Sequence, residues 1–164
     1  MVGGDGGVGK TTLLRKFVTG TFCTDTRMTI GIEFHIKQLV YAGQTYILQL
    51  WDLGGQDRFR FMLSSYCQGA SGALLLFDLT RMSSLDSVQE WVSDVLRKHN
   101  AALPILFCGT KADIIAERSV PYDMGVSIAK SLDCIGYVEL SAKTGQNVEL
   151  AFDLLVDKII KTKS

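Results

Sequence analysis

The stretch GGDGGVGKTT near the start of the chain constrains its fold more than any other feature. Gly4, Gly9, Lys10 and Thr11 fit the pattern G-x-x-x-x-G-K-[ST], which joins a strand to a helix and wraps around phosphate groups. Glycines let successive backbone N–H groups turn toward an anion, and the helix beginning near Lys10 adds the positive end of its dipole. Lys10 is expected to reach the terminal phosphates, and Thr11 is expected to offer its hydroxyl to Mg²⁺. The motif therefore predicts a nucleoside triphosphate site, but it leaves the base and the reaction open.

Strand-like and helical stretches alternate along the chain, which predicts an α/β fold with a mostly parallel sheet and helices on both faces. The expected helices are Lys10–Thr19, Leu85–Asn100, Tyr122–Ser131 and Val148–Lys161, and the expected strands are Ile32–Tyr41, Thr45–Asp52, Ala73–Asp78, Ile105–Gly109 and Tyr137–Leu140. A hairpin turn at residues 42–44 makes one edge strand antiparallel. Only Met1-Val2 precede the glycines, so the first strand of a six-stranded sheet is largely missing. Either residues are missing upstream or the sheet lacks a central strand, and we favour the first alternative because the second leaves buried backbone groups unpaired.

Composition limits the chain to a single domain, residues 1–164, with 47% hydrophobic residues for its core. Lys+Arg and Asp+Glu both number 17, so no broad field attracts nucleic acid or an anionic membrane. The four cysteines lie far apart, which argues against a zinc site and against a disulfide framework. The sequence shows no signal peptide, no bilayer-spanning run and no terminal cysteine for prenylation. We expect a cytoplasmic monomer without a membrane anchor in the given chain, which reaches membranes only through partners or residues outside it.

The stretch WDLGGQD, residues 51–57, follows the second of the paired strands. Asp52 at the end of a strand can hold Mg²⁺ through water, the Gly55 amide can contact a terminal phosphate, and Gln56 can orient an attacking water. A tight turn after a strand is the alternative interpretation. The upstream phosphate loop makes the hydrolase interpretation the better one.

Two later stretches follow strands and carry groups that suit a guanine base. They contribute Thr110, Lys111, Asp113, Ser141, Ala142 and Lys143. A carboxylate such as Asp113 can accept two hydrogen bonds from the edge of guanine, whereas adenine offers no such pair of donors. Lys111 and Lys143 can lay their aliphatic stems on the base, and the Ala142 amide can meet the guanine oxygen. These stretches change the predicted ligand from any triphosphate to GTP.

With these four stretches in order, the chain resembles the small GTPases of the Ras superfamily over essentially its whole length. The resemblance implies a P-loop fold, with Mg²⁺ held by Thr11, Thr29 and Asp52, and with Gln56, Lys10 and Thr29 in catalysis. It aligns Phe22 with an aromatic that stacks on guanine. The residues that it assigns to GTP or GDP are Asp5, Gly6, Gly7, Val8, Gly9, Lys10, Thr11, Thr12, Phe22, Thr29, Gly55, Thr110, Lys111, Asp113, Ser141, Ala142 and Lys143. Gly6 and Gly7 match family positions where a side chain would crowd the catalytic glutamine. Both positions are glycine in this chain, so nothing there forbids hydrolysis.

Within the superfamily the chain is most similar to Rab proteins, through IGIEF, ILQLW, RFRFML, YCQGA and LLLFDLT. This similarity aligns Phe34, Trp51 and Tyr66 with an aromatic patch that meets effectors, although without it these residues read equally well as core. Three departures stand out. In the guanine motif, residues 110–113, Thr110 replaces the usual asparagine. Leu53-Gly54-Gly55 replaces the usual Rab sequence Thr-Ala-Gly and is closer to Arf-like proteins, and the prenylated cysteines of Rab proteins are missing from the given chain.

The expected mechanism is a two-state switch. GTP orders a first switch segment, Thr24–Phe34, and a second switch segment, Leu53–Tyr66, and hydrolysis releases both. No arginine is obviously placed to stabilise the transferring phosphoryl group, so hydrolysis should be slow without an activating partner. An exchange factor and effectors are implied by the resemblance. A binding module with negligible hydrolysis is the alternative function, and a nucleotide kinase is a weaker one because no arginine-rich lid is visible. For His35, His99, Arg58 and Arg60 a surface role is the simpler interpretation.

Overall fold

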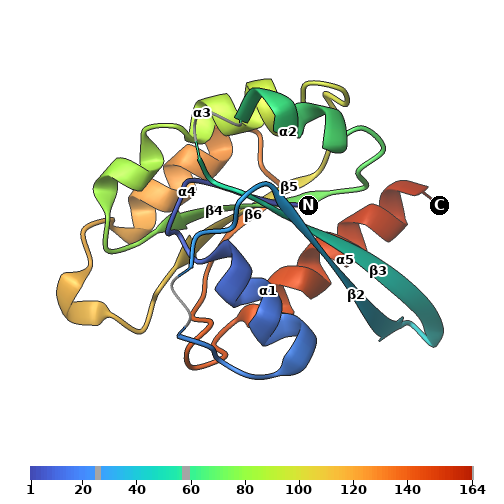
Figure 1. Ribbon diagram of the computed structural model, residues 1–164, viewed down its shortest axis with the longest axis horizontal. Helices are drawn as coiled ribbons and strands as arrows, with labels where there is room; N and C mark the ends of the chain where they lie inside the picture. The colour runs from blue at the N-terminus through green and yellow to red at the C-terminus, as the bar shows by residue number, and fades with distance from the viewer. Residues whose placement is uncertain (25–26, 57–59, 164) are drawn as a thin grey trace.

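The computed structural model describes residues 1–24, 27–56 and 60–163 and contains one six-stranded sheet (Figure 1). The strands are β1 (Val2–Gly3), β2 (Ile32–Tyr41), β3 (Gln44–Leu53), β4 (Ala73–Asp78), β5 (Ile105–Thr110) and β6 (Gly136–Glu139). Their order is β2-β3-β1-β4-β5-β6, with β2 antiparallel to β3 and the other pairs parallel. This arrangement confirms the predicted mostly parallel sheet with one antiparallel edge strand.

The first strand, β1, is only two residues long, but it occupies the central position of the sheet. Val2 pairs with Asp52 of β3 on one side and with Leu74 of β4 on the other. The Leu74 N–H also donates to the Met1 carbonyl at 2.9 Å. The phosphate loop therefore leaves the sheet from its centre, where a P-loop fold requires it.

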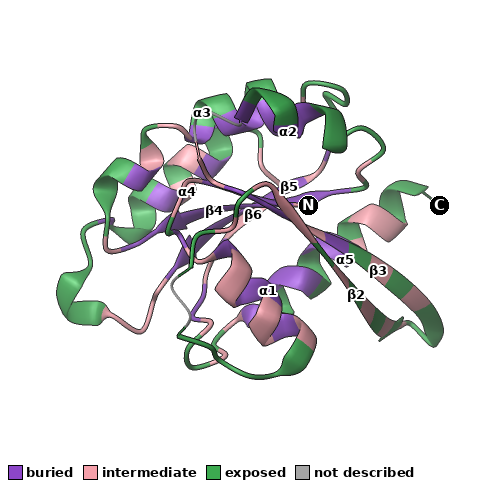
Figure 2. Cartoon of the chain, viewed as in Figure 1, coloured by how far each residue is buried: buried purple, intermediate pink, exposed green. Residues whose placement is uncertain are grey.

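Helices cover both faces of the sheet (Figure 1). They are α1 (Lys10–Thr19), α2 (Arg60–Tyr66), α3 (Val88–Glu90), α4 (Tyr122–Ser131) and α5 (Val148–Lys163), with shorter turns η2 (Met82–Leu85), η3 (Trp91–Leu96) and η4 (Ile115–Glu117). Helices α1 and α5 lie on one face, where Phe17 and Phe152 stack with ring centroids 3.6 Å apart, and α2, α3 and α4 lie on the other. The chain thus has two apolar layers, and β4 and β5 between them are buried throughout (Figure 2). No helix in the described ranges is both long and apolar enough to cross a membrane.

The predicted helix Leu85–Asn100 is wrong in its bounds and its type. The structure has the 3₁₀ turn η2, the short helix α3 and the π-helical turn η3 in its place. The buried hydroxyl of Ser84 lies 2.7 Å from the Arg81 carbonyl and accepts from the Asp78 N–H at 2.9 Å, which holds the chain in a tight turn there. At the other end, the Arg97 N–H reaches back five residues to the Val92 carbonyl. Helix α2 is not among the helices expected from the sequence pattern.

Candidate functional site

A cleft of about 550 Å³ lies where the phosphate loop meets the carboxyl ends of β5 and β6. Most of the predicted nucleotide-binding residues line it. They are Gly6, Gly7, Val8, Gly9, Lys10, Thr11, Thr12, Phe22, Thr29, Gly55, Thr110, Lys111, Asp113, Ala142 and Lys143. The carboxyl end of a parallel sheet is where ligands bind in open α/β folds. Sequence segments more than 130 residues apart therefore share one site.

The phosphate loop depends on glycine at positions that a side chain could not occupy. Gly4 has φ +135°, and a Cβ there would lie 2.3 Å from the Leu76 carbonyl oxygen. Gly9 caps α1 in the left-handed region with φ 97°. Lys10 is buried, and its Nζ donates to the Gly4 and Asp5 carbonyls at 2.7 Å each. Burial lowers the pKa of Lys10 to about 8, against the opposing effect of nearby carboxylates.

Three oxygen-bearing side chains meet at the start of α1. The Thr29 hydroxyl lies 2.6 Å from Thr11 Oγ1, and the Thr11 hydroxyl donates to Asp52 Oδ2. Asp52 is fully buried, and its Oδ1 has no hydrogen-bond partner in the described structure. Burial raises the pKa of Asp52, while the Thr11 hydrogen bond and Lys10 oppose that rise. Hydroxyl and carboxylate oxygens with an unsatisfied buried acceptor suit Mg²⁺, which prefers oxygen ligands and keeps several waters.

The guanine motif is attached to the rest of the cleft through Thr110. Its buried hydroxyl lies 2.6 Å from the Val8 carbonyl and 2.9 Å from the Phe77 carbonyl, which ties the end of β5 to the phosphate loop and β4. Asp113 accepts from the buried Ser141 hydroxyl at 2.6 Å, which fixes one carboxylate oxygen. Ser141 therefore acts on the cleft through Asp113 and does not line it.

Lys111 has φ 62°, and its ammonium lies 2.6 Å from Asp78 Oδ2. Burial alone would raise the pKa of Asp78, but the hydrogen bonds from Lys111 and Thr80 outweigh burial and lower it. Asp78 is thus held as a carboxylate that fixes the stem of Lys111 at the edge of the cleft. No sequence motif points to this role of Asp78.

The family model for the Ras family matches residues 1–161. The chain belongs to the Ras family. It is 37% identical over 156 residues to Ras-related protein RGP2 of Oryza sativa subsp. japonica, covering 95% of this chain and 71% of that relative. Ras-related protein RABA2d of Arabidopsis thaliana gives the same identity and coverage, and RABC2a of the same plant is 40% identical over 163 residues, covering 98% of this chain and 77% of the relative. The chain is therefore a Rab-related small GTPase of the Ras family.

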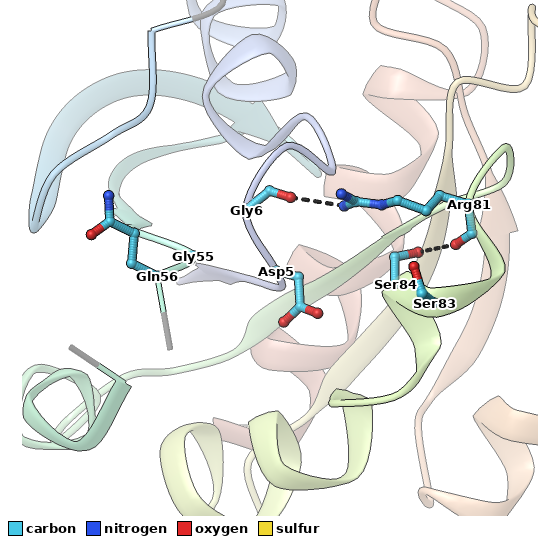
Figure 3. Close-up of a pocket in the computed structure, with 7 residues that line it drawn as sticks. All are labelled: Asp5, Gly6, Gly55, Gln56, Arg81, Ser83 and Ser84. Carbon is cyan, nitrogen blue, oxygen red and sulfur yellow. Dashed lines mark hydrogen bonds between the residues drawn. The ribbon is translucent and has the colours of Figure 1, made fainter. Parts of the chain in front are cut away.

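Gly55 approaches the backbone of the phosphate loop closely. A Cβ on Gly55 would lie 2.3 Å from the Gly6 backbone nitrogen. Gln56 lines a second cavity, of about 440 Å³, together with Asp5, Gly6, Gly55 and Arg81 (Figure 3). Gln56 and the phosphate loop thus line the same cavity.

Asp5 was predicted to bind nucleotide, but its carboxylate turns away from the cleft. Asp5 Oδ1 accepts from Trp91 Nε1 at 2.9 Å, from Arg60 Nη2 at 3.1 Å and from the Ser87 hydroxyl. Only the main chain of Asp5 remains available on the nucleotide side, where its carbonyl already accepts from Lys10. Asp5 therefore connects the phosphate loop to α2 through Arg60, to the N-cap of α3 through Ser87 and to η3 through Trp91.

The surface role considered for Arg60 is wrong. Arg60 is buried, with Nη1 2.7 Å from Glu90 Oε2 and Nη2 3.1 Å from Asp5 Oδ1. Arg58 lies outside the described residues, as do residues 25–26 of the first switch segment and residues 57–59 of the second. His99 is exposed, whereas the Nε2 of His35 is buried and lies 3.8 Å from Glu33 Oε2.

The predicted aromatic patch is on the surface. The rings of Phe34 and Trp51 meet edge to face with centroids 5.1 Å apart, and Tyr66 follows 6.4 Å from Trp51. Phe34 is 46% exposed and Tyr66 is 52% exposed, so they are not core residues. Cross-strand pairing places Phe34 opposite Trp51, which explains why the two rings share one face of the β2–β3 hairpin.

Proposed function

We propose that this chain is a GTP-binding switch that hydrolyses GTP to GDP and recruits effectors in the GTP state. The observation that carries the proposal is the single cleft that joins the phosphate loop, the oxygens around Thr11 and the guanine motif around Asp113. Membership of the Ras family supports the same conclusion.

In the proposed mechanism, backbone N–H groups of the phosphate loop and the ammonium of Lys10 hold the phosphates. Thr11, Thr29 and Asp52 would hold Mg²⁺, which when bound supplies positive charge to the phosphate oxygens. Gln56 orients the attacking water. Thr29 sits within hydrogen-bond distance of Thr11 and therefore brings the first switch segment to the phosphates.

For the switch we propose that GTP holds the first switch segment through Thr29 and the second through Gly55. Gly54 at the start of the second segment is packed: its N–H donates to the Gly31 carbonyl at 2.8 Å, and a Cβ there would lie 2.7 Å from the same oxygen. The extra glycine therefore allows close contact between the two switch segments. This contact favours a working switch over a binding module with negligible hydrolysis.

The partners that we propose are an exchange factor, a GTPase-activating protein and effectors, with effectors docking on Phe34, Trp51 and Tyr66. These side chains offer apolar surface beside both switch segments, so their arrangement can report the nucleotide state. A role in membrane traffic follows from the Rab relationship. Cytoplasmic residence as a monomer stays a prediction, with membranes reached through partners or through residues outside this chain.

Single-turnover GTP hydrolysis tests the proposal. The protein is loaded with GTP and Mg²⁺, and the conversion to GDP is followed for the parent and for Gln56→Ala. We expect slow conversion by the parent and a rate lower by about 10²-fold or more in the variant, because water positioning is lost. Lys158→Ala on α5, far from the cleft, is the control. Equal rates for the parent and Gln56→Ala would contradict the hydrolytic mechanism, and no conversion by either would favour the binding module.

A further inference from the structure

Arg81 stands beside the phosphate loop on a backbone that the fold holds in place. It follows β4 at the start of η2, and its N–H donates to the Asp78 carbonyl at 3.0 Å. The buried Ser84 returns two hydrogen bonds to the Arg81 carbonyl, from its N–H at 3.0 Å and its hydroxyl at 2.7 Å. The attachment point of the side chain is therefore fixed, and only the side chain itself has freedom to turn.

The guanidinium of Arg81 lies against the phosphate-loop backbone. Its Nη2 donates to the Gly6 carbonyl at 2.7 Å (Figure 3), and a Cβ placed on Gly7 would lie 3.8 Å from Nη1. In Figure 3, Gln56 lies on the opposite side of Gly6 from Arg81, and both line the same cavity.

The charge of Arg81 remains available for an anionic ligand. In the described part of the chain, no carboxylate forms an ion pair with Arg81, and its side chain is exposed. Arg60 offers the contrast, because it is buried and pairs with both Asp5 and Glu90. Of these two arginines near the loop, only Arg81 can turn toward the phosphates without breaking an ion pair.

We propose that Arg81 is an internal catalytic arginine for GTP hydrolysis, turning from the Gly6 carbonyl past Gly7 to the phosphates of bound GTP; this rests on the proposed function. In the reaction, the water oxygen bonds to the γ-phosphorus. The bond from that phosphorus to the β–γ bridging oxygen breaks and leaves its electron pair on GDP, and the water proton ends on the released phosphate. The guanidinium neutralises the charge that grows on the phosphate oxygens. Arg81 then supplies part of the positive charge that would otherwise come from an activating partner.

Single-turnover hydrolysis with Arg81→Ala, Arg81→Lys and Arg27→Ala tests the proposal. We expect Arg81→Ala to lower the rate by about 10- to 100-fold, while its GDP affinity stays within about threefold of the parent. Arg81→Lys should keep part of the rate, because it retains the charge without the planar fork. Arg27, which also lines the nucleotide cleft, is the rival position. A loss that follows Arg27 instead of Arg81, or a loss of GDP affinity in Arg81→Ala without a change in rate, would overturn the proposal.

Fluoroaluminate binding to the GDP-loaded protein gives a second readout that needs no turnover. Fluoroaluminate beside GDP imitates the transferring phosphoryl group, and Trp51 beside the second switch segment can report its binding by fluorescence. We expect binding without any partner in the parent and its loss in Arg81→Ala. Equal binding by both proteins would overturn the role of Arg81 while leaving the proposed switch intact. A parent that binds no guanine nucleotide would overturn both.

Discussion

Replacing Thr110 by valine removes one hydroxyl and leaves the shape of the side chain almost unchanged. Thr110 is 3% exposed, and its hydroxyl lies within 2.9 Å of two carbonyl oxygens, those of Val8 and Phe77. A hydroxyl has one hydrogen to donate, so the substitution removes one strong hydrogen bond and leaves carbonyl oxygens facing a methyl group. The free energy of unfolding should therefore fall by about 1–3 kcal/mol.

Urea denaturation followed by fluorescence measures this loss. For an m value of about 2 kcal/mol/M, the midpoint should fall by about 0.5–1.5 M. Release of GDP should also become faster, because the Val8 carbonyl belongs to the phosphate loop that Thr110 holds. Thr162→Val is the matched control, since that exposed hydroxyl donates to the Lys158 carbonyl of its own helix, and it should change stability by less than about 0.5 kcal/mol. An unchanged midpoint in Thr110→Val would refute the view that this hydroxyl joins the guanine motif to the phosphate loop.

Three further substitutions or treatments test other parts of the structure. Asp5→Asn should lower the free energy of unfolding, measured by urea denaturation, by about 2–3 kcal/mol, because the charged acceptor of Arg60 becomes neutral. An unchanged free energy of unfolding would contradict the connecting role of Asp5. Gly125→Ala should destabilise by about 1–3 kcal/mol in thermal unfolding, since its Cβ would lie 2.2 Å from Tyr137 Cζ, and a stabilised variant would show that the ring moves freely. Chelation of Mg²⁺ should speed GDP release. In a titration of GDP release with Mg²⁺, Asp52→Asn should weaken the Mg²⁺ affinity by about 10- to 100-fold. An unchanged Mg²⁺ affinity would show that Asp52 is not part of the metal site.

The sheet and most of the cleft could be predicted because local signals determine them. Buried apolar runs mark strands such as Ala73–Asp78, whose bounds the structure confirms. The glycines and Lys10 have a spacing that only a phosphate loop explains well, and the topology of a parallel sheet then brings the later motifs to the same edge. Helix α1 also follows from its sequence, with Leu13, Leu14 and Phe17 buried and Gly20 ending it in the left-handed region.

Side-chain partners distant in sequence could not be predicted. Gly6 and Arg81 are 75 positions apart, and no sequence pattern predicts their hydrogen bond, which depends on how β4 and η2 pack beside the loop. The same holds for Asp5, which lies within a phosphate-binding motif but turns its carboxylate to Trp91, 86 residues away. A longer helix was expected in place of η2, α3 and η3 because helical periodicity does not distinguish i→i+3, i→i+4 and i→i+5 hydrogen bonding.

We propose that the cleft selects a guanine nucleotide through Asp113. The most direct measurement compares the affinities of the purified protein for GDP and ADP in Mg²⁺ by competition against a fluorescent nucleotide. We expect a preference for GDP of about 10³-fold or more, which Asp113→Ala should largely abolish, because a site built around paired hydrogen bonds rejects a base that lacks the donors. Comparable affinities for GDP and ADP in the parent protein would contradict it.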